Sequence, residues 1–577
     1  MILAPFPSTP PARGARRIAA LLCLSLALTA GGAPAARAQS PNALPSLGDS
    51  ASDDLSVGAE RAIGDQIMRE IRRDPDYLDD PVLLEYLQTI WQRLLVAAQA
   101  RGNIPIELET RYPFEPFLVR ERSINAFALP GGYIGVHLGL IAMTGSPDEL
   151  ASVLAHELSH ITQRHIARSI APSRQASILS IATTILGVIA MGRARSADTG
   201  NAANAVIAGG QAAAIQSQLN FSRDMEREAD RVGYGVLVQA GYSPTAMAEM
   251  FEKLDKESHD AGNYPYLRTH PLTVERIGEA RSRAGVNTLP LPPPNPLEHT
   301  VARARARVLM ETRNEGLRRL EGLDASIAPP PASPDAAFRD SRGERLPDVL
   351  VEAVGGSIAD RLGTAYASAL AATLLRDWAR ADVALAQAFT LARGSPRRED
   401  RALRAVQMLA AQSMLDRGDP ARAAAALAPL RSDASRPVLL LQAQTALAAA
   451  AQASVAGTGP TAALLALPEL QRSADALQTW VATHPQDADA WKALSQIWAR
   501  LAQPLRSLRA DAEAQLAIGD FSGAIDRLRA AQRMARSGGQ VDFIEASVVD
   551  ARLRAIDAQR RALLADDKKN GRGGEPQ

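Results

Sequence analysis

The stretch AHELSHITQRH, residues 155–165, places two histidines four residues apart with a glutamate directly after the first. Residues four apart share one face of a helix, so His156 and His160 can both direct an imidazole at one ion. Glu157 would lie beside that ion, where a carboxylate can act as a general base toward water. Apolar neighbours predict a buried helix over about residues 147–169, and burying these groups without a partner would be costly. A chance match on a solvated helix is the alternative.

A catalytic zinc site needs a third protein ligand. His165 lies five residues after His160 and would be rotated off the ligand face of a helix, so we interpret it as a surface histidine or as support for a ligand. The segment EREAD is a better source, because Glu226 can bind the metal while Asp230 orients a ligand histidine. Glu228 points to another face and ranks second. An exposed helix with internal ion pairs is the alternative.

These motifs resemble those of a known family. HELSH together with EREAD resembles the HExxH…ExxxD gluzincin family, which contains the CAAX-prenyl endopeptidases and the heat-shock protease HtpX. NAFALPGG, residues 125–132, and THP, residues 269–271, match two further family segments. The resemblance covers roughly residues 58–285 by motif and 350–540 by architecture alone.

The resemblance implies one zinc ion per chain, held by His156, His160 and Glu226, with Glu157 as the catalytic base. His270, in the THP segment, is a further catalytic candidate. It could stabilise the oxyanion of the transition state, or occupy the open position on zinc and hold the enzyme off. A turn histidine without a role is the alternative.

The resemblance also implies an edge strand that binds extended substrate backbone. Such a strand has unpaired N–H and C=O groups, so main-chain hydrogen bonds would hold an added peptide. An ordinary internal strand before a turn is the alternative. The implied substrate-binding residues are Asn125, Ala126, Phe127, Ala128 and Leu129.

The N-terminal residues predict a secretory signal. A basic region precedes an apolar stretch over residues 18–30, and Ala36-Arg37-Ala38 matches a small-x-small cleavage site. Cleavage near Gln39 would remove Cys23, the single cysteine, which fits an oxidising compartment. We therefore expect a periplasmic protein, with an uncleaved anchor as the alternative.

Composition and charge limit the fold and the partners. The chain has 577 residues, too many for one core, and its net charge of +1 gives no global argument for binding nucleic acid. Abundant alanine and leucine favour helix, whereas residues 104–143 alternate as strands do, with Pro130-Gly131-Gly132 as a turn. The expected fold class is mainly α, with a gluzincin-type α+β domain that has a small sheet, followed by an α-helical repeat domain.

The region after about residue 350 consists of alanine-rich helix pairs. Polar Gly-Asp turns, small residues at the expected contacts and a period in the thirties resemble tetratricopeptide repeats. The similar segments are 366–396, 407–430, 489–508 and 509–535. A helical bundle without repeat register is the alternative.

Proline-rich stretches and changes of pattern predict the domain boundaries. The expected regions are a signal peptide (1–38), a flexible segment (39–57), a zinc metalloprotease domain (58–288), a proline-rich linker with a helical segment (289–350), a tetratricopeptide-like domain (351–565) and a disordered tail (566–577). The apolar residues 176–192 predict a docking helix or a peripheral membrane contact. With the stretch up to residue 218 they could cover the site as a lid.

These features predict a periplasmic zinc endopeptidase for protein quality control. Resemblance to periplasmic family members implies unfolded or misassembled outer-membrane β-barrel proteins as substrates and the β-barrel assembly machinery as a partner. The alternative is a chaperone or adaptor of outer-membrane assembly in which the zinc is structural or vestigial. The intact Glu157 argues against that alternative, because a purely structural site needs no base.

Overall fold

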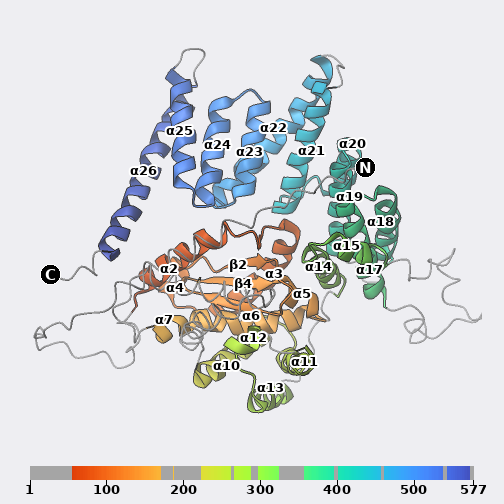
Figure 1. The fold of residues 1–577 in the computed structure, drawn as a ribbon, viewed down its shortest axis with the longest axis vertical. Coiled ribbons are helices and arrows are strands. Elements are labelled where there is room, and N and C mark those ends of the chain that lie inside the picture. Colours follow the sequence, from red (N-terminus) through yellow and green to blue (C-terminus); the bar gives the residue numbers. More distant parts are fainter. Residues whose placement is uncertain are drawn as a thin grey trace, which may run out of the picture. The chain divides into compact units, whose positions relative to one another are not determined.

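The computed structural model describes most of the chain (Figure 1). The described ranges are residues 55–170, 186, 222–261, 265–286, 296–323, 357–394, 400–455, 460–536 and 542–571. The predicted signal peptide and most of the predicted docking segment 176–192 lie outside them. Among the described helices, none is long and apolar enough to cross a membrane.

A four-stranded sheet forms in the N-terminal part of the chain. Its order is β1-β2-β4-β3, with β2 parallel to β4 and the other two pairs antiparallel. The strands are β1 (Tyr77–Leu78), β2 (Glu115–Val119), β3 (Ala126–Leu129) and β4 (Tyr133–His137). Gly131 and Gly132 supply the positive φ angles, 77° and 91°, at the turn between β3 and β4. Among the described strands β3 pairs with β4 alone, so it forms one edge of the sheet.

Two segments that the sequence predicted as strands are helices. In α4 (Ile106–Arg111), Glu107 and Glu109 lie in the first turn, where the helix dipole favours acidic side chains. In α5 (Leu138–Met143) nearly every residue is buried. An apolar run this short has no periodicity that separates strand from helix. The strand prediction was therefore wrong at both ends of residues 104–143.

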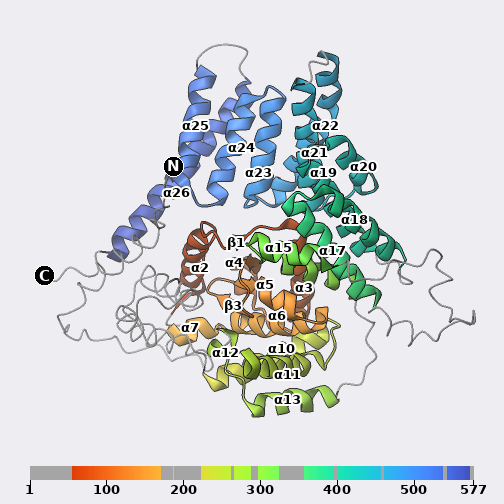
Figure 2. The ribbon, with the colours of Figure 1, turned by 45° about the vertical axis from the view of Figure 1, so that its right-hand side comes forward.

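Helices cover the sheet in layers. They are α2 (Val57–Ile71), α3 (Pro81–Ala100), α6 (Pro147–Thr162), α7 (His165–Ile170), α10 (Arg223–Gln239), α11 (Ala246–Ala261), α12 (Pro265–Thr269) and α13 (Val274–Val286). α6 packs on β3, and α10 and α11 pack on α6. In Figures 1 and 2, α10, α11 and α13 lie on the side of α6 away from the sheet. α6 is thus enclosed between strands and helices.

The single helix predicted over residues 147–169 is two helices. Ser146 caps the start of α6 by accepting a hydrogen bond from the Glu149 N–H at 3.2 Å. α6 ends at Thr162, because Arg164 adopts a left-handed conformation with a φ angle of 53°. An ion pair of 3.0 Å with Glu60 holds Arg164 there. The break thus depends on a tertiary contact, which the local pattern did not show.

The C-terminal half is a succession of helices. They are α14 (Pro296–Leu309), α15 (Asn314–Glu321), α17 (Ile358–Leu375), α18 (Trp378–Arg393), α19 (Asp400–Asp416), α20 (Pro420–Leu427), η3 (Ala428–Leu430), α21 (Arg436–Val455), α22 (Pro460–Thr483), α23 (Ala488–Arg500), α24 (Pro504–Ala517), α25 (Phe521–Arg536) and α26 (Phe543–Gly571). α26 continues into the segment 566–577 that the sequence predicted as a disordered tail. The predicted boundary between segments 489–508 and 509–535 falls inside α24 and was wrong.

Four turns between these helices share one geometry. Their left-handed residues are Arg376, Gly418, Ala502 and Gly519. In each turn the amide after the left-handed residue donates to the carbonyl five residues earlier, which closes the preceding helix. The next helix then begins within two residues of that left-handed position. The repeated device keeps α17–α18, α19–α20, α23–α24 and α24–α25 as adjacent pairs.

α14 contributes to two hydrophobic cores. Leu297, Val301 and Val308 are buried with α17, α18 and α19, whereas Ala302 and Ala306 are buried with α3, α5 and α6. The segment predicted as a linker therefore contains a helix that is packed on both sides.

Candidate metal centre

α6 presents the two histidines of HELSH on one face. Both are buried, and their Nε2 atoms lie 3.0 Å apart. Leu154, Leu158 and Ile161 are buried on the surrounding faces of the helix, so the motif lies within the core. The helical spacing and the apolar flanks in the sequence account for this arrangement.

α10 brings a carboxylate to the same point. Glu226 is buried, and its carboxylate oxygens lie 3.4 Å from Nε2 of His156 and 3.4 Å from Nε2 of His160. Gly233 permits the approach, because a Cβ there would lie 2.9 Å from the carbonyl oxygen of Ala155 on α6. The close packing of α10 on α6 thus converts two distant motifs into one cluster.

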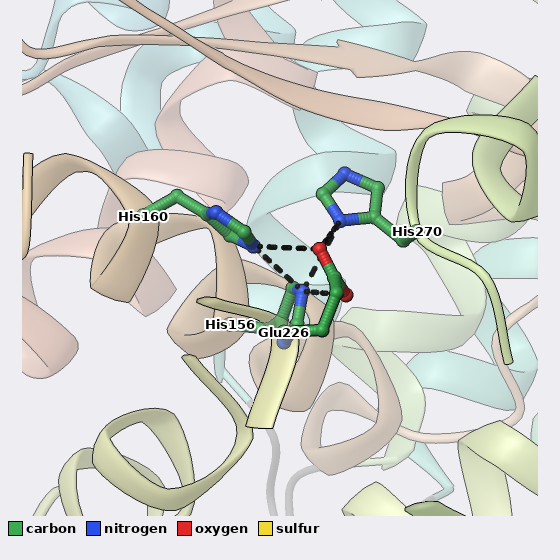
Figure 3. Close-up of side chains that lie close together, drawn as sticks. All are labelled: His156, His160, Glu226 and His270. Atoms are coloured by element: carbon green, nitrogen blue, oxygen red, sulfur yellow. Dashed lines mark hydrogen bonds and ion pairs between the residues drawn. The ribbon is translucent and has the colours of Figure 1, made fainter. Parts of the chain in front are cut away.

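His270, which follows α12, completes the group (Figure 3). Its Nδ1 lies 3.0 Å from Oε1 of Glu226 and 3.3 Å from Nε2 of His156. One candidate ligand atom from each of His156, His160, Glu226 and His270 lies within 4.8 Å of the others. The ring of Tyr266 stacks on that of His270, with their centroids 4.8 Å apart.

The cluster fits a metal ion. Three imidazoles and one carboxylate converge in a buried space, and a shared cation would satisfy donor atoms that crowd one another at about 3 Å. Nitrogen and carboxylate donors of this kind suit a divalent transition metal, and the set matches the ligands found around zinc.

The charges of the cluster are strongly coupled. Burial lowers the pKa of His156, but hydrogen bonds to Asp230 and Glu226 outweigh burial and raise this pKa to about 10. Burial lowers the pKa of His160 well below its usual value. Burial opposes ionisation of Glu226, yet His270 and His156 hold its pKa far below the usual range. The cluster therefore holds an ionised Glu226 and a neutral His160 beside a protonated His156, and His156 has to release its proton when a metal ion binds.

Glu157 lies beside the cluster and not within it. It is fully buried, and burial raises the pKa of its carboxyl group. Its Oε2 accepts a hydrogen bond of 3.1 Å from the N–H of Ala128, and its Oε1 lies 3.4 Å from Nε2 of His270. A raised pKa brings a carboxylate nearer to the range in which it can take and return a proton at neutral pH.

Asp230 and Arg276 support the cluster from behind. Oδ1 of Asp230 lies 3.0 Å from Nδ1 of His156. Arg276 pairs with both oxygens of Asp230 at 2.7 and 2.8 Å, and lies 2.9 Å from Glu226. It also donates to the carbonyl oxygen of Pro271 at 2.8 Å. Sequence reasoning missed Arg276, because nothing near it in the sequence indicates a partner on α10.

Comparison with known proteins shows which family this part of the sequence resembles. The model of peptidase family M48 matches residues 85–284. Residues 85–284 are thus similar to peptidase family M48, and the cluster lies within them. We call these residues the M48 domain.

Relatives extend the similarity of the M48 domain. The chain is 35% identical over 262 residues to the β-barrel assembly-enhancing protease of Escherichia coli (strain K12), covering 45% of this chain and 51% of that protein. It is 38% identical over 242 residues to the Yersinia pestis protein of the same name, covering 42% and 47%. It is 28% identical over 229 residues to the metalloprotease LoiP of Escherichia coli, covering 40% and 82%. The chain thus spans about half the length of the first two relatives.

The M48 domain places β3 against Glu157. The N–H of Ala128 points away from β4, toward Oε2 of Glu157. Backbone groups alternate in direction along a strand, so those of Ala126 face the same open side. Asn125 precedes the strand, and its carbonyl accepts from the His137 N–H at 3.0 Å. Phe127 covers Gly135 of β4, and Leu129 pairs with Tyr133 at the end of the hairpin.

His165 of the M48 domain is buried, so the reading of it as a surface histidine was wrong. The break after α6 turns its Nδ1 to within 3.0 Å of Nδ1 of His160. Its Nε2 lies 3.1 Å from Glu228, the residue ranked second as a ligand. The rotation argument assumed a continuous helix.

Of the predicted docking segment, the described residue Leu186 packs against a cluster that includes Ile63, Phe117 and Leu129.

Proposed function

We propose that this protein is a zinc-dependent endopeptidase that cleaves peptide bonds in unfolded or misassembled proteins. The observation that carries the proposal is the buried convergence of His156, His160 and Glu226, with Glu157 beside them against an edge strand. A purely structural metal site would need neither the base nor the strand.

In this proposal different residues bind the metal, transfer the proton and position the ligands. His156, His160 and Glu226 hold one zinc ion, which when bound supplies a Lewis acid that activates water and polarises the scissile carbonyl. Glu157 accepts a proton from the attacking water through Oε1, because Oε2 is held by Ala128. The same oxygen then delivers the proton to the leaving amine. Asp230 and Arg276 keep the ring of His156 and the carboxylate of Glu226 in place.

The open side of β3 is the proposed substrate site. An extended peptide would pair with the backbone of Ala126 and with the carbonyl of Ala128, because the Ala128 N–H already donates to Glu157. This pairing would place the scissile bond beside Glu157. Strand addition recognises the extended backbone of a peptide more than its side chains. It therefore favours segments that are not folded. Asn125, Phe127 and Leu129 are proposed to shape the ends and the covered side of this strand.

The proposed setting is the periplasm, with outer-membrane β-barrel proteins as substrates and their assembly machinery as a partner. The names of the Escherichia coli and Yersinia pestis relatives support this setting, together with the signal-like N-terminal sequence. The repeated helix turns after residue 357 support a tetratricopeptide-like scaffold within residues 351–565. We keep residues 58–288 as the proposed limits of the metalloprotease domain.

A Glu157→Gln variant tests the proposal. We expect it to retain one zinc per chain and to lose at least about 100-fold in the rate of cleavage of an unfolded β-barrel protein, because the proton acceptor is gone. The matched control is Glu252→Gln on α11, which alters an exposed carboxylate paired with Arg281. Zinc would be counted by atomic emission and cleavage followed on gels.

The outcome separates the endopeptidase from a chaperone or adaptor. If Glu157→Gln cleaved as fast as the wild type, the proposed base would be wrong. If neither protein cleaved while both prevented aggregation of the substrate equally well, the chaperone reading would replace the endopeptidase.

A further inference from the structure

The chain after α6 places a third histidine of the HELSHITQRH segment behind the first two. In a continuous helix His165 would lie about 140° around the axis from His160, facing away from it. Instead the left-handed Arg164 ends α6 and redirects the chain, so that the two rings meet edge to face with centroids 4.8 Å apart. This backbone conformation is unfavourable for a residue other than glycine, so a contact must hold the turn. The ion pair between Arg164 and the buried Glu60 does so.

A chain of polar contacts runs outward from His160. Its Nδ1 lies 3.0 Å from Nδ1 of His165, and Nε2 of His165 lies 3.1 Å from Oε2 of Glu228. The same carboxylate oxygen accepts from Arg168 at 2.9 Å. His165 is fully buried, whereas the side chain of Glu228 is 27% exposed. The chain therefore connects a buried candidate ligand to the rim of the domain.

The direction of each hydrogen bond from His160 to Glu228 follows from the charge of Glu228. The ionised carboxylate of Glu228 can only accept, so Nε2 of a neutral His165 carries the proton. Nδ1 of His165 is then an acceptor, and the proton between the two Nδ1 atoms belongs to His160. His160 is left with an unprotonated Nε2, which is the atom that faces His156 and Glu226. The outer carboxylate thus selects the tautomer in which Nε2 can bind a metal.

We propose that His165 and Glu228 are positioning residues, which fix the ring and the tautomer of His160 for metal binding. This inference rests on the proposed zinc site. His156 has the equivalent support directly, since Asp230 lies 3.0 Å from its Nδ1. His160 obtains its carboxylate support through an intervening imidazole. Arg168 fixes the carboxylate at the outer end.

Zinc affinity tests this support, measured by competition with a chromophoric chelator on the full chain. His165→Phe fills the same space but cannot accept a hydrogen bond from His160. We expect it to weaken zinc binding by roughly 10- to 100-fold. In His165→Asn the amide oxygen can replace Nδ1 as an acceptor, so we expect this variant to recover at least half of that loss on a logarithmic scale. A purely packing role would give the opposite order, because Phe fills the space better than Asn.

Glu228→Gln provides a second test that does not disturb the core. It lies at the rim, and we expect a loss in zinc affinity of several-fold, with metal-free melting temperature unchanged. Glu252→Gln, which removes a similar carboxylate from an exposed ion pair, should leave zinc affinity unchanged. If His165→Phe does not fold, the Glu228→Gln result decides.

The possible results are distinguishable. Equal zinc affinity in the wild type, His165→Phe and Glu228→Gln would overturn the inference and leave the zinc site intact. No zinc binding by the wild type would overturn the proposed function itself.

Discussion

His270 lies closer to the candidate ligands than a simple turn histidine requires. Its Nδ1 is 3.0 Å from Glu226 and 3.3 Å from His156, and its ring is buried against Tyr266. Its Nε2 faces Glu157 at 3.4 Å. His270 thus contacts both the proposed base and the candidate ligands, as the latch hypothesis requires.

A His270→Ala variant should raise the basal rate of cleavage several-fold, because the open side of the cluster is released. The measurement is the initial rate on an unfolded β-barrel substrate at equal zinc occupancy. His484→Ala, at an exposed histidine in the helical region, is the control. A fall of about 100-fold without any gain would contradict the latch and would indicate a donor to the transition state.

The packing of α10 on α6 determines whether the two motifs form one site. Gly233 faces the backbone of α6 near Ala155, which is the residue before His156. Gly235, two residues later, faces only the end of the Arg101 side chain, which can move. Two glycines of one helix therefore differ in what an added methyl group would meet.

Gly233→Ala should reduce the free energy of unfolding by about 1–3 kcal/mol, because the methyl group would force α10 away from α6. Zinc affinity should fall with it, since Glu226 moves with α10. Gly235→Ala is the matched control and should be neutral or stabilising by up to about 1 kcal/mol, through higher helix propensity. Urea unfolding of both variants measures the difference. Equal effects at the two positions would show that the approach of the helices does not depend on Gly233.

α14 connects the M48 domain to the C-terminal helices by polar as well as apolar contacts. The Arg305 guanidinium on α14 is buried, pairs with both oxygens of Asp80 at 2.7 Å and donates to the Tyr366 hydroxyl. His299 bridges Tyr86, at 2.6 Å, and the carbonyl of Thr144, at 3.0 Å. Removing one partner from such buried groups is costly, so these contacts couple the two cores through one helix.

His299 should make the stability of the whole molecule depend on pH. Burial lowers its pKa to about 4, so the folded protein keeps the ring neutral while the unfolded chain takes up a proton near pH 6.5. The contribution of His299 to the free energy of unfolding is therefore fully present above pH 6.5, the pKa in the unfolded chain. This contribution is lost as the pH falls toward 4. Between pH 7.5 and pH 5 this pKa shift corresponds to a loss of about 2 kcal/mol.

Urea unfolding at these two pH values measures the effect. His299→Gln can keep both hydrogen bonds without titrating, so its pH dependence should be smaller by about that amount. The same slope in both proteins would contradict the assignment to His299. His484→Gln, at an exposed position, is the control for a histidine that does not lie in the core.

The sequence by itself determined the helix that carries HELSH, the charged helix with EREAD and the turn at residues 130–132. These features depend on spacing of three or four residues, caps and glycine, which act locally. The sequence also predicted that HELSH and EREAD form one site, through their resemblance to a known family. The predicted strands at Ile106–Arg111 and Leu138–Met143 were wrong, since short apolar or mixed segments lack a distinguishing period.

The tertiary structure alone decided how the site is assembled. Arg276 and His165 act on residues that are 46 and 5 positions away, through helices whose approach or termination depends on contacts elsewhere in the chain. Glu60 holds the turn that redirects His165, and Gly233 lets Glu226 reach His156. Such contacts join surfaces that no local period relates. The sequence therefore predicted the candidate ligands and Asp230, whereas only the fold placed Arg276 and His165 behind them.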